Sequence, residues 1–524
     1  MNALALEQRG DVLIVDCGVT FDNRGLGIDV IHSDFSAIKR LASGEARVAG
    51  LWITHGHEDH IGAIPYFLRQ FDVPIFAPPY ALELLRERSG EHEILKHART
   101  TAIEPRKRYA VGSFIVEPVR VTHSIADATA AAIETDAGMI FHTGDFKFDD
   151  HPADGEHYDI DRMRELGDAG VSLLFSDSTN TDVPGPTGSE SSVRGALHDI
   201  VASSKGAVIV GLFASNVHRL RILGEIAKAT GRILVPLGRS VGMHARVAAA
   251  TGYLPWGADR LFRAENLRDV PRERILAIAT GTQAETRSAL LRLSRGEHSS
   301  FAVKEGDTVI FSSRIIPGHE PEVYAMKGDF LRRGVNVRSR ATDRGVHVSG
   351  HAHRVDQQRM IELIRPNTFV PVHGTLDHLT RHASLARELG VKETCILENG
   401  DIADFDGKSV RKLSHAPVGR VHAFAGREIP GEVLKDRMQL GAGGVVIVSV
   451  EKGDISVRSL GVMGIDDADG VAAMKSAVKT AVDEARDQGS TSKEAITDAA
   501  RTAVRRVAMK RLGYKPLVVV VSAS

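Results

Sequence analysis

The chain has 524 residues, of which 43% are apolar and 25% are charged, and its net charge is −1. This length exceeds one compact core, so we expect roughly two to four domains. The near-neutral charge excludes bulk basicity as a means of binding nucleic acid, so any such surface must be local. The two cysteines, Cys17 and Cys395, exclude a disulfide framework. With no apolar run of transmembrane length and no signal peptide, we expect a cytoplasmic protein without a membrane partner.

In the first part of the chain, strands alternate with helices, and polar residues follow the strand ends. Residues 11–18 predict a buried strand that ends in a glycine turn. Residues 48–71 predict a strand, a short loop and a helix from about Ile61. Three later stretches each predict an apolar strand that ends in polar residues: 113–124, 138–149 and 171–180. Open α/β folds place ligands at the carboxyl ends of strands, which makes these polar residues candidates for a site.

The middle of the chain has a cleaner repeat of strand, turn and helix, from about Ser189 to about Arg344, which predicts a separate parallel-sheet domain. Histidines at strand ends return after it, so we expect the middle domain to be an insertion into the first. Beyond about Gly400, Gly-rich strands, a polar helical stretch and the terminal "YKPLVVVVSAS" predict a small α+β domain. The predicted domain boundaries are 1–188, 189–345, 346–435 and 436–524.

The stretch "THGHEDHIG" carries three histidines and two acids within six residues. In extended backbone His55 and His57 point the same way, and Asp59 and His60 follow at the start of a helix. Imidazole and carboxylate together suit Zn²⁺ or a similar metal. Two neighbouring metals could share the loop, with His55 and His57 on one and Asp59 and His60 on the other. A solvated loop with chance histidines is the alternative, which four ligands at this spacing disfavour.

Two later stretches add candidate ligands. His123 in "RVTHS" and Asp145 in "HTGDFK" both follow strands, and a carboxylate with two oxygens suits a bridge between metals. His142 competes with Asp145 in the second stretch, although we expect a structural role for it. Asp16 in "VDCG" is either a partner that orients a ligand histidine or a structural turn residue, with equal weight.

Several motifs resemble those of a known superfamily. "HGHEDHIG", "HTGDF" and "VHG" resemble the metallo-β-lactamase superfamily. "FSDSTN", "SGHAH" and "PVHG" resemble its nuclease branch with an inserted β-CASP domain. "GLFASNVHRL", "FSSRIIPGHE" and "ILENGD" resemble ribonuclease J of the bacterial type, over nearly the whole chain, although such chains usually carry "GEIGMN" where this one begins at Met1 and Asn2. The expected fold class is α/β: a metallo-β-lactamase αββα sandwich, an inserted β-CASP parallel-sheet α/β domain and a small α+β C-terminal domain.

The resemblance implies a site with two zinc ions per subunit, with Mn²⁺ as the alternative metal. The implied ligands are His55, His57, His123 and Asp145 for one ion, and Asp59, His60, Asp145 and His373 for the other. Catalytic roles are implied for Asp59, Asp177 and His351, the last as a phosphate contact or as the proton donor to the leaving oxygen. The expected substrate contacts are Ser215, Asn216, Val217, Arg314, His347, Val348, Ser349, Gly350 and His351.

The implied function is a zinc-dependent ribonuclease with 5′→3′ exonuclease and endonuclease action on single-stranded RNA, in RNA maturation, ribosomal RNA included, and decay. The resemblance also implies a homodimer or homotetramer and partners in an RNA-decay complex. A DNA-directed β-CASP nuclease is an open alternative, because contacts to the 2′-hydroxyl cannot be read from sequence. A small-molecule metallo-hydrolase of the thioesterase or lactamase type would need no middle domain. A non-catalytic RNA-binding scaffold is disfavoured by the complete set of proposed ligands.

Overall fold

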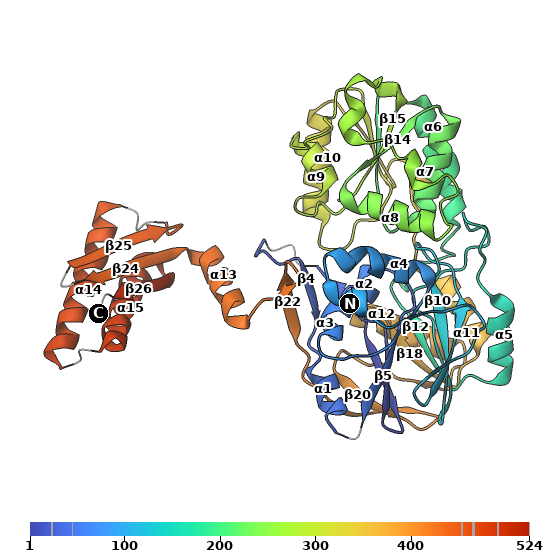
Figure 1. Ribbon diagram of the computed structural model, residues 1–524, viewed down its shortest axis with the longest axis horizontal. Coiled ribbons are helices and arrows are strands. Elements are labelled where there is room, and N and C mark those ends of the chain that lie inside the picture. Colours follow the sequence, from blue (N-terminus) through green and yellow to red (C-terminus); the bar gives the residue numbers. More distant parts are fainter. Residues whose placement is uncertain (22–24, 45, 452–453, 464–466, 490–491, 523–524) are drawn as a thin grey trace. The chain divides into compact units, whose positions relative to one another are not determined.

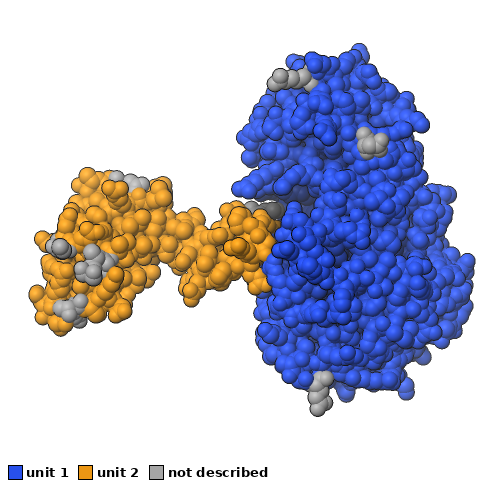
Figure 2. All heavy atoms as spheres, in the orientation of Figure 1, with its two compact units in different colours: residues 1–21, 30–421 blue, residues 22–29, 422–524 orange. Residues whose placement is uncertain are grey.

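The computed structural model describes residues 1–21, 25–44, 46–451, 454–463, 467–489 and 492–522. The chain divides into two units, one of residues 1–21 and 30–421 and the other of residues 22–29 and 422–524 (Figure 2). All the candidate site residues belong to the first unit. Within the described ranges, no helix is long and apolar enough to cross a membrane.

Two sheets of the first unit share one core (Figure 1). The smaller sheet has the order β1 (Leu4–Gln8), β2 (Asp11–Val15), β5 (Arg47–Trp52), β6 (Ile75–Ala77), β7 (Thr100–Ala102). The larger has the order β19 (Glu393–Thr394), β18 (Thr368–Val372), β12 (Leu173–Asp177), β11 (Gly138–His142), β10 (Thr129–Thr135), β9 (Phe114–Arg120), β8 (Tyr109–Val111). Leu13 and Trp52 of the smaller sheet pack against Phe114, Phe175 and Val370 of the larger one. Branched and aromatic side chains of this kind suit a pleated surface between two sheets.

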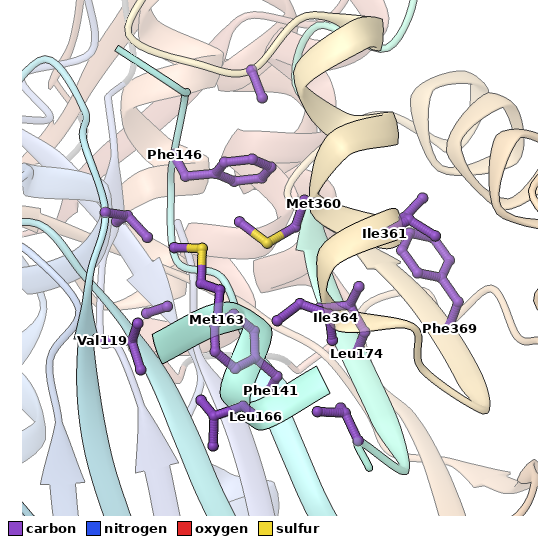
Figure 3. Close-up of a cluster of buried hydrophobic side chains, with 14 of the residues drawn as sticks. Val119, Phe141, Phe146, Met163, Leu166, Leu174, Met360, Ile361, Ile364 and Phe369 are labelled. Carbon is purple, nitrogen blue, oxygen red and sulfur yellow. The ribbon is translucent and has the colours of Figure 1, made fainter. Parts of the chain in front are cut away.

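Helices cover the outer faces of the two sheets. Figure 3 shows Met163 and Leu166 of α5 (Ile160–Ala169) and Met360 and Ile364 of α11 (Arg354–Ile364) packed with Phe141 of β11. Helix α12 (Leu376–Glu388) adds to the same layer. Helices α1 (Ser36–Ala42) and α4 (Pro79–Glu87) contact β5 and β7 of the smaller sheet. The layers are therefore helix, sheet, sheet, helix, which confirms the expected αββα sandwich.

A parallel sheet is inserted between β12 and β18. Its order is β14 (Ile233–Leu237), β15 (Ile275–Ala279), β13 (Val208–Gly211), β16 (Thr308–Phe311), β17 (Asn336–Ser339), with every pair parallel. The helices of this region are α6 (Val193–Ser203), α7 (Val217–Ala229), α8 (Arg239–Ala250), α9 (Ala289–Arg295) and α10 (Glu320–Arg332). Strands β12 and β18 then pair in parallel within the larger sheet, so the chain returns to the sandwich after the insertion. The numerical domain boundaries stay predictions.

The remaining elements are short strands and the second unit. Strands β3 (Val19–Thr20) and β4 (Val30–Ser33) pair with each other, as do β20 (Asp401–Phe405) with β21 (Val410–His415) and β22 (Arg420–Phe424) with β23 (Arg427–Glu428). After α13 (Gly431–Gly443) comes a sheet of order β25 (Asp454–Leu460), β24 (Val445–Glu451), β26 (Leu517–Ser522). Helices α14 (Ala468–Asp487) and α15 (Lys493–Leu512) pack on it through Met474 and Val504. This is the small α+β domain that the sequence predicts.

A buried polar pair joins the inserted sheet's helices to the sandwich. The Tyr80 hydroxyl of α4 lies 2.8 Å from Nδ1 of His244 on α8. Burial, together with nearby His57 and Arg88, lowers the pKa of His244 to about 3. The ring is therefore neutral at physiological pH, and its Nδ1 shares a hydrogen bond with the Tyr80 hydroxyl.

We expect His244 to weaken the folded state in acid. The unfolded chain protonates this residue near the ordinary histidine pKa of 6.5, whereas the folded protein does so only near about 3. Stability from this group is thus complete above pH 6.5 and is lost as the pH falls toward 3. In His244→Asn, Oδ1 can accept the same hydrogen bond without titrating. Between about pH 7.5 and about pH 5, Tm should drop less in this variant than in wild type, and equal drops would contradict the assignment.

Candidate metal centre

The loop after β5 presents four of the candidate ligands in and just before a very short helix, α2 (Glu58–Ile61). The helix begins at Glu58 rather than near Ile61, so Asp59 lies in its first turn, where the helix dipole favours an anion. A new helix, α3 (Ile64–Leu68), follows because Pro65 has no N–H to continue the first. The single helix expected from the sequence is therefore wrong, and two short helices stand in its place.

The backbone approaches this loop closely at Gly18. A Cβ atom at Gly18 would lie 1.6 Å from the carbonyl oxygen of Asp59, so no other residue fits without moving the chain. The neighbouring Cys17 N–H donates to the carbonyl of His60 over 2.7 Å. These contacts fix the backbone that carries Asp59 and His60.

A first group of ligand-capable atoms consists of His55, His57, His123 and Asp145. His57 Nδ1 lies 3.1 Å from Nε2 of His55 and 3.1 Å from Nε2 of His123. Around one Zn²⁺ with ordinary bond lengths, tetrahedral nitrogen ligands lie about 3.3 Å apart, so this spacing fits a metal. Burial lowers the pKa of His57 to about 4 and also lowers the pKa values of His55 and His123. Neutral imidazole is the form that binds metal.

A second group shares Asp145 with the first and adds Asp59, His60 and His373. Asp145 Oδ2 lies 3.2 Å from His60 Nε2, and Asp145 Oδ1 lies 3.2 Å from His373 Nδ1. Asp59 Oδ2 is 3.3 Å from His373 Nε2. Asp145 Oδ2 also lies 3.7 Å from His55 Nε2 and 3.8 Å from His123 Nε2. One carboxylate therefore lies beside histidines of both groups, which is where a bridging ligand would stand.

A third group, which the sequence does not predict as a ligand set, consists of Asp145, Asp177, His351 and His373. His351 Nδ1 lies 2.9 Å from Asp177 Oδ2, at the end of β12. Burial alone would lower the pKa of His351, but the carboxylates of Asp177 and Asp145 outweigh it and raise that pKa. This pair can therefore hold a proton beside Asp145.

Fixed partners orient the histidines toward the cluster. His60 Nδ1 is 2.7 Å from Asp16 Oδ2, and His123 Nδ1 is 2.7 Å from the carbonyl oxygen of Gly350. These oxygens only accept hydrogen bonds, so each Nδ1 carries a proton and each Nε2 is the atom directed at the cluster. Asp16 also sits in a left-handed turn with φ 62°, so both roles considered for it hold.

His142 lies outside the three groups found among the described residues. Its Nδ1 accepts a hydrogen bond from the N–H of Gly144 over 3.0 Å, and the side chain is buried. This is the structural role expected for it.

The candidate substrate residues fall into two kinds. Arg314 donates to Asn180 Oδ1 over 2.6 Å, and Asn180 Nδ2 donates to Ser349 Oγ over 2.9 Å, which links Arg314 to the loop that ends at His351. By contrast, Asn216 accepts from the N–H of Arg219 over 2.9 Å as the N-cap of α7, and Val217 is 1% exposed. The structure gives those two side chains structural tasks.

The remaining substrate candidates lie near these contacts. Ser215, beside Asn216, keeps a partly exposed side chain. In the loop, His347 and Val348 are half-buried, and His347 Nδ1 lies 3.5 Å from the guanidinium of Arg219.

Sequence reasoning missed three neighbours of the cluster. Asn2 Nδ2 lies 3.0 Å from His60 Nε2 and donates to the carbonyl oxygen of Asp59 over 3.3 Å. Thr179 donates to Asp177 Oδ1 over 2.6 Å, and Asn180 makes the contacts just described. Thr179 and Asn180 belong to the motif "FSDSTN", which could have identified them as neighbours of the site. For Asn2 the signal was the asparagine of the "GEIGMN" pattern.

Comparisons with known proteins agree with this geometry. Four segments match family models: residues 2–171 the metallo-beta-lactamase superfamily, 205–328 "Ribonuclease J, beta-CASP domain", 334–397 "Zn-dependent metallo-hydrolase RNA specificity domain", and 432–523 "Ribonuclease J C-terminal domain". A crystal structure of a protein of unknown function from Enterococcus faecalis V583 aligns with a TM-score of 0.53 and 15% identity, over 78% of this chain and 96% of that one. That likeness concerns the fold alone.

Curated relatives are more similar. The chain is 35% identical to Ribonuclease J of Synechocystis sp. over 86% of this chain and 70% of that one. It is 38% identical to Ribonuclease J of Mycolicibacterium smegmatis, over 86% and 80% respectively. It is 34% identical to Ribonuclease J of Helicobacter pylori and spans 66% of that protein's length.

The sandwich and its edge of histidines and aspartates define a hydrolase of the metallo-β-lactamase superfamily, a class that binds divalent metal. The β-CASP and C-terminal matches, with relatives that are 34–38% identical, narrow the class further. The chain belongs to the ribonuclease J family of metal-dependent RNA hydrolases.

Metal affinity should depend more on Asp145 than on His142, a nearby histidine that lies outside the three ligand groups. We expect Asp145→Ala to lower metal affinity by more than the about 10–100-fold that loss of an outer partner costs, because every group shares this carboxylate. His142→Asn is the matched control, since its amide oxygen can replace the buried acceptor. Metal content after dialysis, measured by mass spectrometry, tests this. Equal metal retention in the two variants would exclude Asp145 as a ligand.

Proposed function

We propose that this protein binds two zinc ions per subunit, with Mn²⁺ as the alternative, and cleaves single-stranded RNA by 5′→3′ exonuclease and endonuclease action. One ion would be held by His55, His57, His123 and Asp145, and the other by Asp59, His60, Asp145 and His373. The observation that carries the proposal is the proton-holding pair of His351 and Asp177 beside the carboxylate that both groups share. When bound, the two ions would lower the pKa of a water molecule and neutralise the phosphate.

Asp59 is the member of the second group that solvent reaches best. Its side chain is 38% exposed, whereas those of His60 and Asp145 are 2% and 3% exposed. An attacking water would therefore lie on the Asp59 side of the cluster. The carboxylate can accept one hydrogen bond from that water and so orient it toward phosphorus.

His351 acts as the proton donor in this proposal. When the water oxygen attacks phosphorus, the P–O3′ bond breaks and the departing 3′-oxygen takes the proton of His351. Asp177 holds the ring by its Nδ1 and favours the protonated form. The phosphate stays on the downstream fragment, which therefore begins with a 5′-phosphate, while the upstream fragment ends in a 3′-hydroxyl. The attacking water loses a proton to solvent, and solvent returns a proton to His351.

A phosphate-holding surface next to His351 would account for exonuclease action. Arg314 supplies a positive charge, and Asn180 connects it to Ser349 of the loop His347–His351. A terminal 5′-monophosphate held there would place the next linkage over the cluster. Ser215, with its partly exposed side chain, is a further contact in this proposal. Such an enzyme would act in the cytoplasm in RNA maturation and decay, with partners in an RNA-decay complex.

The test uses purified, metal-loaded protein and single-stranded RNA with a 5′-monophosphate, a 5′-triphosphate or an internal label, beside a matching DNA. We expect stepwise mononucleotide release from the monophosphate end. His351→Ala should slow it about 10²–10⁴-fold, the usual contribution of a general acid. His57→Ala should lose both metal and activity.

The control for these variants is His198→Ala, which removes an exposed histidine of α6 and should keep wild-type rates. Preferred cleavage of the DNA would favour the DNA-directed alternative. Turnover of a thioester or lactam with intact RNA would refute the ribonuclease assignment.

We also propose that the second unit assembles the protein into a homodimer or homotetramer. Helices α14 and α15 cover one face of its sheet, while Ile447, Val519 and Val521 on the other face are 43%, 42% and 53% exposed. Ile447 and Val519 are paired in register, so their side chains lie next to each other on this face. Apolar side chains grouped in this way commonly mark a contact between proteins.

Val519→Glu should therefore shift the mass in solution toward the monomer, because the charge would be buried without a partner at the contact. Light scattering coupled to size exclusion measures this. Leu413→Glu, at an exposed apolar position of β21, is the matched control and should keep the wild-type mass. An unchanged mass for Val519→Glu would remove this face as the contact.

A further inference from the structure

Four charged side chains are buried together between the candidate metal centre and the inserted parallel sheet. Lys147 and Arg219 are 0% exposed, Glu190 is 1% and Asp149 is 2% exposed. They come from distant parts of the chain: two from the segment that follows Asp145, one from the entry to α6 and one from α7. Buried ion pairs rarely stabilise a fold better than apolar side chains of the same size would, so stability alone is a weak reason for this cluster.

The four charges neutralise one another. Lys147 Nζ lies 3.2 Å from Asp149 Oδ2, which also accepts from the N–H of Glu190 over 2.7 Å. The guanidinium of Arg219 lies 2.6 Å from Glu190 Oε1. Lys147 is 4.0 Å from the other oxygen of Glu190, an atom with no hydrogen-bond partner among the described residues. Glu190 therefore stands between two cations and connects them.

Arg219 reaches further than its ion pair. Its Nη1 donates to the Ser312 carbonyl over 2.9 Å and to the Ser312 hydroxyl over 2.6 Å. The same hydroxyl donates to the carbonyl oxygen of Val346 over 2.6 Å, and Nη1 is 3.5 Å from His347 Nδ1. The planar guanidinium can hold several acceptors in one fixed geometry, which a lysine cannot do. Arg219 thus holds the backbone where the loop His347–His351 begins.

The other end of that loop is fixed by the metal centre itself. Gly350 accepts from His123 over 2.7 Å, and the N–H of Ala352 donates to the carbonyl of Phe146 over 2.6 Å. A Cβ at Gly350 would lie 2.5 Å from Ser124 Oγ, so the fit is close. The loop therefore has one end on the candidate ligands and the other on Arg219, a residue of the inserted domain.

We propose that Arg219 is a positioning residue, which fixes the start of the loop His347–His351 so that Ser349 and His351 meet the RNA phosphate in register with the metal centre. This rests on the proposed function, since it assigns the loop to the substrate. Contacts run from Lys147 through Glu190 to Arg219. They connect the start of the loop His347–His351 to the segment that carries Asp145.

The experiment compares Arg219→Lys with Arg232→Lys. Arg232 is a second buried arginine of the inserted domain, and it donates to the carbonyls of Ser204, Gly206 and Ile275, away from the loop. Each full-length, metal-loaded variant is given 5′-monophosphorylated RNA and bis(p-nitrophenyl) phosphate. Nitrophenolate leaves without a proton donor, so the small diester reports on the metal centre and is insensitive to the position of His351.

We expect Arg219→Lys to lower kcat/KM for RNA by about tenfold or more, since a small misplacement of a reacting group has effects of this size. Turnover of the small diester should stay within about twofold of wild type. Arg232→Lys should leave the ratio of the two activities unchanged, even where it lowers Tm. Equal loss of both activities in Arg219→Lys, or the same ratio in both variants, would overturn the proposal.

A milder variant covers the case in which Arg219→Lys does not fold. Ser312→Ala removes only the hydroxyl that joins Arg219 to Val346. It should lower RNA cleavage several-fold with the small diester unaffected, and wild-type RNA cleavage would overturn the proposal. Wild-type protein that cleaves the diester but no RNA would refute the proposed function instead, which separates the two failures.

Discussion

The carboxylate of Asp145 is the constraint on which the whole site depends. Five histidines approach its oxygens within 3.8 Å: His55, His60, His123, His351 and His373. Burial raises the pKa of this carboxyl, but the histidines, above all His373 and His60, bring it well below its usual range. An ionised carboxylate at this depth needs such compensation, because an unpaired buried charge would unfold the region. His60 and His123 are in turn held from their far sides, by Asp16 and by the carbonyl of Gly350. Asp177 contacts both His351 and His373, so the loss of one partner would disturb several ligands.

That arrangement requires the two halves of the sandwich to close around the insertion. His55, His123 and Asp145 precede the inserted domain, while His351 and His373 follow it. Parallel pairing of β12 with β18 sets Asp177 opposite Val372, which places His373 beside the cluster. His373 has φ 55° and Asp16 has φ 62°, conformations that cost energy for such residues and persist where the surrounding contacts fix them. The strain at two cluster residues therefore indicates how firmly the strands and the buried charges hold this edge.

The sequence predicts the fold class and the residues of the cluster because both leave local signals. His55, His57, Asp59 and His60 lie within one turn, and His123, Asp145 and Asp177 stand at or just after strand ends, where the pattern of apolar runs points. The contacts of Glu190 and Arg219 leave no such signal, because they form only when segments far apart in the sequence come together in the folded chain. Pro65 is a sequence signal for the break between α2 and α3. The apolar residues on either side of it nevertheless favour one continuous helix, so the break is missed. The structural tasks of Asn216 and Val217 follow from the register of α7, which motif matching does not resolve.

Charge explains how a protein with a net charge of −1 can attract RNA. Five of the seven candidate ligands are imidazoles, and burial keeps His55, His57 and His123 neutral. By contrast, nearby carboxylates, above all Asp145, raise the pKa values of His60 and His373. Among the proposed ligands, only Asp59 and Asp145 carry negative charge, so two divalent ions with their ligands would keep an excess of positive charge. A phosphodiester anion and an ionised water would complete the balance. Carboxylates in place of the histidines would cancel that excess. The buried charges of Lys147, Asp149, Glu190 and Arg219 cancel one another, so they do not weaken the attraction of the metal centre for an anionic substrate.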